Sequence, residues 1–446
     1  MPKPTKKEVP LHKNQIECIK HFIKTLQLEN GNLITTDYAQ FIKLDECLLT
    51  SIKLSEHFEK YQLGSFIRNL AWSLLKTHKN IDERKKRFEL DSWLDSCVKT
   101  ITQTLNSIPI EYLGSISLPA LTTPFPVNEK ITSKISLTTT TGTTSNDNSI
   151  VTALMKNKGY SYSRTELMPS TTYINIITNG YSDGNINSTA SSEFLSSLKQ
   201  FLALALILNL LTADKHQLGL LANIKIENSD RATTPHWVIK PAKLSLLDPR
   251  HMEVPPELGA FINMLNLNSK NLTILKDNPK SMTTLGSIIE ASPENESEFG
   301  EALVRKLEQL SKFFSLPDSF DKKRICAALE WYLDAKSTKN QSTSLIYFCI
   351  GLEAILSDDS KSRELQLKDK LSDRVAYIIG KTQSQRASWK KSFVEIYEAR
   401  SDLVHAKKPR LSKHNTDLLL EAEFMLKILI SRELNGLIDS YKKKST

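Results

Sequence analysis

No apolar run in the sequence is long enough to span a membrane. The longest, FLALALILNLL from Phe201 to Leu211, has 11 residues, whereas a transmembrane helix needs about 20. We therefore expect this segment to form a buried helix. The first ten residues, MPKPTKKEVP, are polar and lack the order of basic, apolar and small residues that marks a secretory signal. We expect no membrane partner and a cytoplasmic location.

Motifs for metals and cofactors are also missing. The cysteines form no CxxC pair and are odd in number, which argues against a zinc site and against a disulfide framework. His216, His236 and His251 are scattered, and surface or core histidines explain them better than a ligand cluster does. No P-loop, GxGxxG, HExxH, GxSxG or EF-hand pattern occurs, so we expect no metal and no cofactor. The five cysteines are Cys18, Cys47, Cys97, Cys326 and Cys349.

What the chain does have is length and positive charge. Its 446 residues are more than a domain with a single hydrophobic core usually contains, which favours two or three domains. A hydrophobic fraction of 40% with 24% charged residues is typical of a soluble globular protein. The net charge of +9 and the pI near 9.0 suggest a polyanionic partner. Nine basic residues between Lys381 and Lys413 accompany only three acidic ones, although a solvated basic face would also explain this segment.

Hydrophobic periodicity divides the chain into three parts. Residues 11–106 carry apolar residues at three- and four-residue spacing with few glycines or prolines, which predicts helices. From Ile110 to about Leu247, alternating segments with NG and DG turn signals predict strands around a leucine-rich helix at Ser191–Ala213. The prolines of Pro249–Gly259 indicate a linker. Beyond them, six amphipathic or buried segments predict a helix bundle. The expected strands lie at 130–141, 171–185, 215–230 and 236–248.

The expected fold class is therefore α+β with several domains. A helical N-terminal region would occupy residues 1–108 and a β-rich or α+β domain residues 109–255. An all-α domain would occupy residues 256–446.

A permanently charged side chain stands on an apolar helical stripe in the stretch YEARSDLVHAKKP, Tyr397 to Pro409. On a helical wheel with about 100° per residue, Arg400 lies about 20° from Trp389, in the middle of the stripe. Because arginine keeps its proton, a guanidinium there must keep water, find an anion or cost several kcal/mol. The other members of the stripe are Phe393, Ile396, Tyr397, Leu403 and Val404.

A histidine follows this arginine. His405 lies about 140° further round a straight helix than Arg400, and Pro409 predicts that the helix ends nearby. The negative end of the helix dipole favours a protonated imidazole. An arginine aimed at a polyanion and a titratable imidazole are the two parts needed for RNA self-cleavage, in which the 2′-OH attacks the adjacent phosphate. The bare spacing is expected by chance, and Arg231 to His236 repeats it in a segment that belongs to no helix.

Four blocks in the C-terminal part resemble the HEPN superfamily, and most closely the Apea-like HEPN domains of prokaryotic defence proteins. They are CAALEWYLDA at 326–335, SLIYFCIGLEAILS at 344–357, LSDRVAYIIG at 371–380 and YEARSDLVHAKK at 397–408, and their order and spacing match over roughly the last 150 residues. The resemblance implies that Arg400 and His405 form the R-x(4-6)-H ribonuclease motif of the family. It also implies that two copies pair so that both motifs line one cleft, and that RNA is cut without a metal. The first 250 residues resemble no family by motif.

The resemblance also implies a role for individual residues. His405 would act as general acid and base on the 2′-OH or the leaving 5′-oxygen, and Arg400 would hold the scissile phosphate. Ser401 stands where many members have Asn, Asp or His, and together with Asp402 it is expected to orient the histidine. The alternative is that Arg400 pairs with a carboxylate inside the bundle and His405 caps a helix. The expected RNA contacts are Lys390, Lys391, Lys407, Lys408 and Arg410.

Glu353 and Tyr397 are further candidates to support the site. Glu353 is a lone carboxylate in LIYFCIGLEAIL, a helix that is apolar almost all round. The preferred interpretation is a structural pair with Arg374, and the alternative is that Glu353 reaches Arg400 and tunes the site. Tyr397 precedes Arg400 by one helical turn and could lend its hydroxyl, although a core aromatic needs no such role.

The leading hypothesis is a metal-independent endoribonuclease of HEPN type, with the parts before residue 256 acting as a sensor or restraint. The resemblance implies antiphage defence by abortive infection, with tRNA or mRNA as target. The expected partners are RNA, a second copy of the chain and a phage-derived activator. Two alternatives remain open: a non-catalytic dimerisation or RNA-binding module that contacts phosphates alone, and the toxin of a toxin–antitoxin pair.

Overall fold

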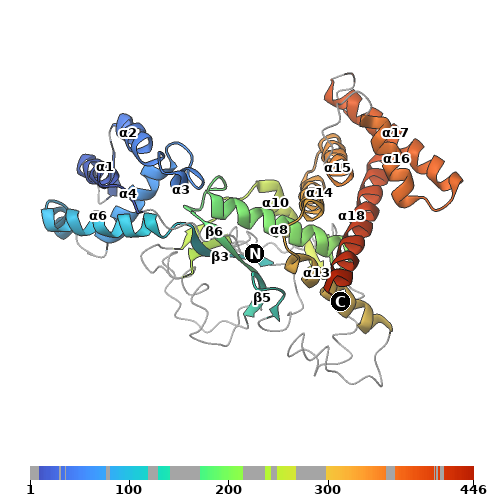
Figure 1. Ribbon diagram of the computed structural model, residues 1–446, viewed down its shortest axis with the longest axis horizontal. Coiled ribbons are helices and arrows are strands. Elements are labelled where there is room, and N and C mark those ends of the chain that lie inside the picture. Colours follow the sequence, from blue (N-terminus) through green and yellow to red (C-terminus); the bar gives the residue numbers. More distant parts are fainter. Residues whose placement is uncertain are drawn as a thin grey trace, which may run out of the picture.

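The computed structural model describes residues 10–29, 32–35, 37–76, 81–118, 129–140, 171–213, 237–242, 249–267, 298–357, 367–405, 407, 410–411 and 416–445. In these parts of the chain, N-terminal helices, a central antiparallel sheet and C-terminal helices follow one another along the molecule (Figure 1). The expectation of a mixed fold with a sheet in the middle and helices in the C-terminal part is therefore confirmed.

The N-terminal region is helical, as its apolar spacing predicts. The first helix begins at a reciprocal capping box between His12 and Gln15, and it buries Ile19, Phe22 and Ile23. A short antiparallel hairpin that the sequence did not predict follows it, formed by β1 (Gln27–Glu29) and β2 (Asn32–Ile34). The helices are α1 (Lys13–Thr25), α2 (Tyr38–Leu48), α3 (Ile52–Ser55), α4 (Gln62–Leu75), α5 (Ile81–Phe88) and α6 (Asp91–Asn106).

A disulfide joins α1 to α2 through Cys18 and Cys47, whose Cα atoms lie 6.8 Å apart. The expectation that the cysteines form no disulfide is therefore wrong. An odd count leaves one cysteine over but does not prevent a pair, and the packing of α1 on α2 brings together two residues separated by 29 positions. The other three cysteines, Cys97, Cys326 and Cys349, are free.

Six strands form one antiparallel sheet in the order β4-β5-β6-β3-β8-β9. The long strands β3 and β6 pair along their whole length, from Ile110 opposite Gly180 to Leu118 opposite Thr172. The expected strands within 130–141, 171–185 and 236–248 are confirmed, whereas 215–230 lies outside the described residues. The strands are β3 (Ile110–Leu118), β4 (Glu129–Lys130), β5 (Ile135–Thr140), β6 (Thr171–Gly180), β8 (Trp237–Pro241) and β9 (Arg250–His251).

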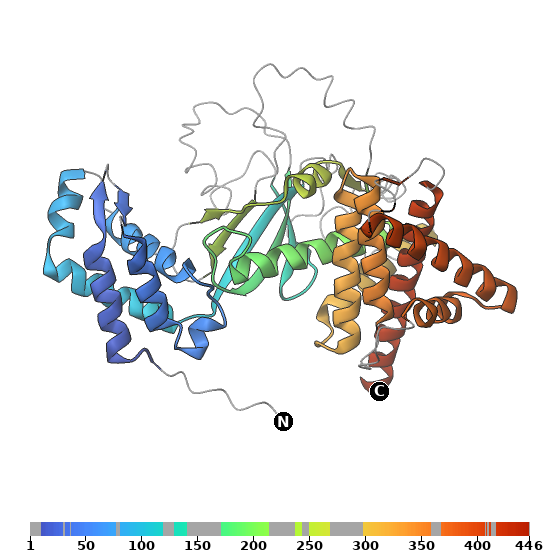
Figure 2. The same ribbon diagram turned by 90° about the horizontal axis from the view of Figure 1, so that it is seen from above.

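The leucine-rich helix α8 (Thr189–Ile207) packs on the sheet and extends toward the C-terminal helices (Figure 2). Every residue of α8 from Phe201 onward is buried, which confirms a core helix for residues 201–207 of the longest apolar run. The helix stops short of the expected Ala213, because Asn209 adopts a left-handed backbone with φ 55° and Leu211 begins a strand. That strand is β7 (Leu211–Ala213).

The proline-containing segment Pro249–Gly259, expected to be a linker, takes part in regular structure. Its β9 residues pair with β8, and α10 (Pro256–Ile262) starts immediately after Pro255. Proline suits the first turn of a helix, since the missing N–H is not needed there. The next strand, β10 (Leu265–Leu267), pairs antiparallel with β7.

All six helices expected in the C-terminal part are present. α14 and α15 pack along each other, and the long α18 contacts α13, α14, α15, α16 and α17 (Figure 1). Within the described residues, none of the helices has both the length and the apolarity to cross a bilayer. The helices are α13 (Glu298–Ser315), α14 (Phe320–Ser337), α15 (Gln341–Leu356), α16 (Leu367–Ile379), α17 (Gln383–Val404) and α18 (Thr416–Ser445).

Hydrogen bonds and an ion pair join α8 to α14. Ser196 Oγ and Gln200 Nε2 both donate to Glu330 Oε1, at 2.6 and 2.7 Å. One turn further along α14, Asp334 Oδ1 lies 2.8 Å from Lys199 Nζ. Burial raises the pKa of Asp334, and the hydrogen bond from Lys199 opposes that shift. The helix that covers the sheet is therefore bonded directly to the C-terminal helices.

Candidate functional site

The helix α17 carries both members of the predicted motif. It begins at Thr382, which forms a capping box with Gln385, and it ends at Val404. The expectation that the helix ends shortly before Pro409 is thus confirmed. Arg400 lies in the last full turn, and His405 is the C-terminal capping residue.

Most of the predicted apolar stripe faces the interior. Phe393 and Ile396 are buried, and Trp389, Tyr397 and Leu403 are partly buried against the core. Val404 departs from the expectation, because its side chain is 47% exposed. The helix ends at this residue, so α17 provides no further turn that would cover it.

The Arg400 guanidinium lies in a half-buried position between two side chains. Its Nη2 is 3.7 Å from Glu353 Oε1, and 24% of the Arg400 side chain is exposed. Its Cζ lies 5.6 Å from the centre of the Tyr397 ring, which is a cation–π distance. The guanidinium donates no hydrogen bond to any residue in the described chain, and the Nε atom is buried without a partner. Arg400 therefore pairs with a carboxylate inside the bundle, as the alternative for this residue predicted, and only its Nη atoms retain N–H donors that a second anion can reach.

Glu353 pairs with Arg400, so the preferred interpretation of a pair with Arg374 is wrong. Glu353 lies on α15, which packs against α17 as well as against α16. The wheel of one helix shows that a carboxylate lies on an apolar surface but does not show which neighbouring helix faces it. The alternative stated for Glu353, contact with Arg400, is the one that the structure supports.

The surroundings of this pair are poorly solvated. Burial raises the pKa of the Cys349 thiol to about 12, and the Glu353 charge acts in the same direction. Burial also raises the pKa of Tyr397, again with a smaller contribution from Glu353. Both groups are therefore uncharged at neutral pH, and the charges left in this cluster are those of Glu353 and Arg400.

His405 is exposed at the end of α17. Its backbone N–H donates to the Ser401 carbonyl oxygen at 3.0 Å, and its imidazole makes no hydrogen bond to any residue that the structure describes. The side chains of Ser401 and Asp402, expected to orient the imidazole, do not bond to it. Asp402 Oδ1 instead lies 3.9 Å from Lys407 Nζ. The imidazole is accessible, and no contact with the described residues of the same chain fixes its orientation.

The predicted RNA-contacting residues differ in exposure and in the acidic side chains that lie close to their charges. Lys390 Nζ is 2.6 Å from Asp373 and Lys391 Nζ is 3.8 Å from Glu395, so acidic neighbours offset both charges. Lys407 and Arg410 are exposed close to His405 in sequence, and Asp402 offsets the charge of Lys407 in the same way. Lys408 lies outside the described residues, as do Arg231 and His236 of the repeated spacing.

An exposed apolar surface lies on α18 beside α17 and was not predicted from the sequence. Leu420 is 61% and Phe424 is 56% exposed, and they lie one helical turn apart. Phe424 stacks on Trp389 of α17 with ring centres 6.2 Å apart. The signal was present in the sequence, since α18 has apolar residues on more than one side. We call Trp389, Leu420 and Phe424 the α17–α18 surface.

In the described residues, no group of three or more His, Cys, Asp or Glu side chains is arranged to hold a metal ion. Comparison of the chain with known proteins identified no relative. No protein-family model, no curated protein and no solved structure matches the chain.

Proposed function

We propose that the chain is a metal-independent endoribonuclease of the HEPN type, with Arg400 and His405 as its catalytic residues. The observation that carries the proposal is the partly exposed Arg400 guanidinium, whose Nη atoms form no hydrogen bond to the described residues, close to the end of α17 where His405 is exposed. The four sequence blocks that resemble the family lie on α14, α15, α16 and α17, which pack together with α18. This arrangement suits a single helical catalytic unit.

The proposed reaction is an attack of the RNA 2′-oxygen on the adjacent phosphorus. The P–O bond to the 5′-oxygen breaks, and the products are a 2′,3′-cyclic phosphate and a 5′-hydroxyl. His405 takes the proton of the 2′-OH or protonates the leaving 5′-oxygen. Arg400 stabilises the negative charge that builds on the phosphate oxygens, because planar N–H donors match two of these oxygens at once.

Glu353 would position Arg400 in this reaction. At 3.7 Å the pair is held by charge without a short hydrogen bond, and 27% of the Glu353 side chain is exposed. A phosphate can therefore accept the free N–H groups of Arg400 while Glu353 keeps the guanidinium close to α15. Tyr397, whose ring faces Arg400, would restrict the guanidinium from the other side.

A second copy of the chain would complete the site. The α17–α18 surface is apolar and exposed, and its Trp389 belongs to the helix that carries Arg400 and His405. Burying exposed aromatic and leucine side chains favours association, and aromatic residues are enriched in protein interfaces. A homodimer through this surface would bring two copies of α17 together, and the partner would supply contacts that orient His405.

The biological role that we propose is antiphage defence by abortive infection in the cytoplasm, with tRNA or mRNA as substrate. The N-terminal helices and the sheet would sense a phage-derived activator or restrain cleavage. This sensing role is supported by the hydrogen bonds and the ion pair that join α8 to α14. A structural change in the sheet region would be transmitted through these contacts to the proposed catalytic helices.

End mapping of RNA tests the proposed reaction. Wild type, Arg400→Ala and His405→Gln would be expressed with and without phage, and cellular RNA ends would be sequenced. We expect wild type to produce 2′,3′-cyclic phosphate ends in the presence of a chelator, and both variants to lose at least about a hundredfold in cleavage. His251→Gln, an exposed histidine on β9, is the matched control and should cut as wild type does.

Salt-dependent RNA binding separates the enzyme from a binding module. If the protein is the enzyme, His405→Gln should bind RNA as wild type does while cutting is lost, because phosphate contacts do not need the imidazole. Uncut RNA in wild-type cells under phage challenge, together with unchanged phage protection by both variants, would refute the proposal. RNA binding without any cleavage would favour the non-catalytic module.

A further inference from the structure

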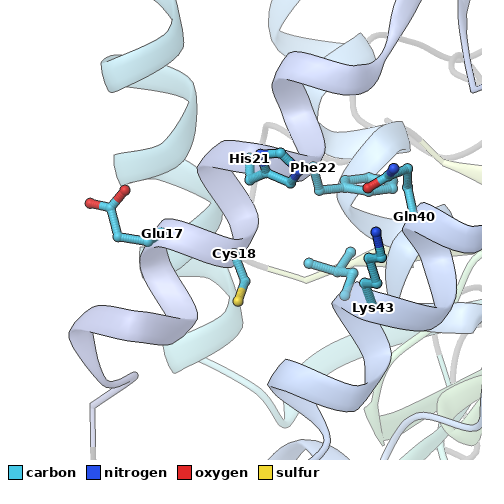
Figure 3. A pocket seen from close by; sticks show the side chains of 7 residues that line it. Glu17, Cys18, His21, Phe22, Gln40 and Lys43 are labelled. Atoms are coloured by element: carbon cyan, nitrogen blue, oxygen red, sulfur yellow. The ribbon is translucent and has the colours of Figure 1, made fainter.

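An open pocket of about 340 Å³ lies between α1 and α2 in the N-terminal region (Figure 3). Its apolar part is formed by Phe22 and Leu44, and Cys18 of the disulfide lines it as well. A volume of this size accommodates a small molecule. The pocket therefore gives a small molecule access to one sulfur of a covalent link between two helices.

The two sulfurs of the link differ in their access. Cys18 and Cys47 are both partly exposed, but only Cys18 lines the pocket. Cys47 Sγ instead lies 3.9 Å from the backbone oxygen of Asn14. A reagent that enters the pocket therefore reaches Cys18 Sγ, and Cys47 is the sulfur that leaves.

The three free cysteines are poor competitors for thiol chemistry. Burial raises the pKa of Cys97, Cys326 and Cys349 to about 12 in each case. Cys97 and Cys349 are buried and Cys326 is partly buried, and because the thiolate is the reactive form, all three thiols react slowly at neutral pH. Cys18 and Cys47 are therefore the favoured site for reversible thiol chemistry among the five cysteines.

A basic side chain lies one helical turn from each sulfur. His21 follows Cys18 by three residues on α1, and Lys43 precedes Cys47 by four on α2, so each pair shares a helix face. Both basic residues line the pocket. Lys43 forms no ion pair or hydrogen bond with any residue in the described parts of the chain, and its charge acts only weakly on Asp37.

The acidic residue of the pocket does not cancel this charge. In Figure 3 the Glu17 carboxylate points away from the space between the helices, whereas the Lys43 side chain extends into it. Gln40 lines the same side, and its amide nitrogen is bonded to Asp37 at 2.9 Å. Reactive cysteines occur in partly exposed, electropositive surroundings of this kind.

We propose that Cys18–Cys47 is a thiol–disulfide exchange site for a small thiol that carries carboxylates, such as glutathione. The thiolate attacks Cys18 Sγ, a mixed disulfide forms there, and Cys47 leaves as a thiolate. A second thiol then attacks the sulfur of the bound small molecule and releases Cys18. In total, two thiols are oxidised to one small disulfide, and the protein disulfide gains two electrons and two protons. Lys43 attracts the carboxylates and stabilises the Cys47 thiolate that leaves in the first step, and His21 lies beside Cys18, which leaves in the second.

Thiol counting on the full-length protein tests whether the link exchanges. After equilibration with glutathione disulfide and denaturation, wild type should show three reactive thiols, and after reduced glutathione it should show five. Cys47→Ser should trap one glutathione on Cys18, as read by mass spectrometry of the peptide. Cys97→Ser is the control and should leave the exchange unchanged. Five thiols after the oxidised treatment, or an adduct on a buried cysteine instead, would overturn the proposal.

Rates with charged and neutral thiols test the role of the pocket. Lys43→Gln should slow reduction by glutathione about fivefold, because one partly solvated charge contact is lost, and it should change the rate with 2-mercaptoethanol much less. An equal effect on both reagents, or no effect on either, would show that the pocket does not select an anionic thiol. Lys60→Gln, an exposed lysine outside the pocket lining, is the matched control. The exchange does not depend on RNA cleavage, so Arg400→Ala should not alter it.

Discussion

At the scale of single residues, the main result is the pairing of Arg400 with Glu353. A guanidinium on an apolar stripe needs an anion or water; here Glu353 is the anion, and 24% of the Arg400 side chain is exposed. The ion pair is only partly buried and lacks hydrogen bonds at Arg400 Nε and Glu353 Oε1. It is therefore a moderate stabilising contact that leaves the arginine able to bind another anion.

Removing the carboxylate charge should lower stability. Glu353→Gln keeps the shape of the side chain but leaves Arg400 without its anion, and we expect a loss of about 1–2 kcal/mol in the free energy of unfolding by urea. In a double-mutant cycle with Arg400→Gln, the two effects should fall short of additivity by at least about 0.5 kcal/mol.

An exposed ion pair on the same helix provides the control. Glu395→Gln removes the partner of Lys391, whose side chain is 79% exposed, and we expect a change within about 0.5 kcal/mol. Additive effects of the Glu353 and Arg400 substitutions would mean that the two side chains are not coupled in solution.

At the scale of secondary-structure elements, the position of α8 depends on a close approach to the sheet. Gly114 of β3 lies directly under Phe194 of α8, and a Cβ at Gly114 would come within 2.1 Å of the Phe194 ring. A residue with a side chain could not occupy this place unless the ring moved. Because α8 also bonds to α14, a shift of α8 would be felt beyond the sheet.

Gly114→Ala should therefore destabilise the protein. We expect a loss of about 1–3 kcal/mol, measured as a lower urea midpoint, since an added methyl group must displace a buried ring. The matched change Gly436→Ala, in α18 with no atom within 4 Å of the added Cβ, should be neutral or stabilise by about 0.5–1 kcal/mol. Equal effects at the two glycines would contradict the packing of α8 on β3.

At the scale of the whole molecule, the contact between α8 and α14 links the central sheet to the C-terminal helices. Glu330 accepts hydrogen bonds from Ser196 and Gln200, and Lys199 pairs with Asp334. The pairing of β7 with β10 adds backbone hydrogen bonds between segments on either side of α10. The sheet and the catalytic helices that we propose are therefore expected to respond to each other.

Breaking the α8–α14 contact should weaken the whole protein. Glu330→Ala leaves two donors on α8 without their acceptor, and we expect a loss of about 1–3 kcal/mol in unfolding free energy. Glu308→Ala removes an exposed pair with Lys312 on α13 and should change stability by no more than about 0.5 kcal/mol. A loss at Glu330 no larger than that at Glu308 would indicate that the interface is weak in solution.

Local patterns in the sequence predicted much of the fold. The six C-terminal helices, the buried helix α8 and three of the expected strand segments follow from periodicity, because each depends on residues that are neighbours along the chain. The hairpin β1–β2 was missed, since strands of three residues are too short to display a period. The apolar position of Arg400 and the end of α17 before Pro409 were also predicted correctly.

The sequence by itself determined most of the longer helices and strands and the apolar side of α17, since these properties depend on spacing along the chain. Only the tertiary structure decided which partners meet. It joined Cys18 to Cys47, placed Glu353 beside Arg400 and added β9 to the sheet. These pairings depend on which faces of elements far apart in the sequence pack together. The spacing of residues along one element does not show which other element it will contact.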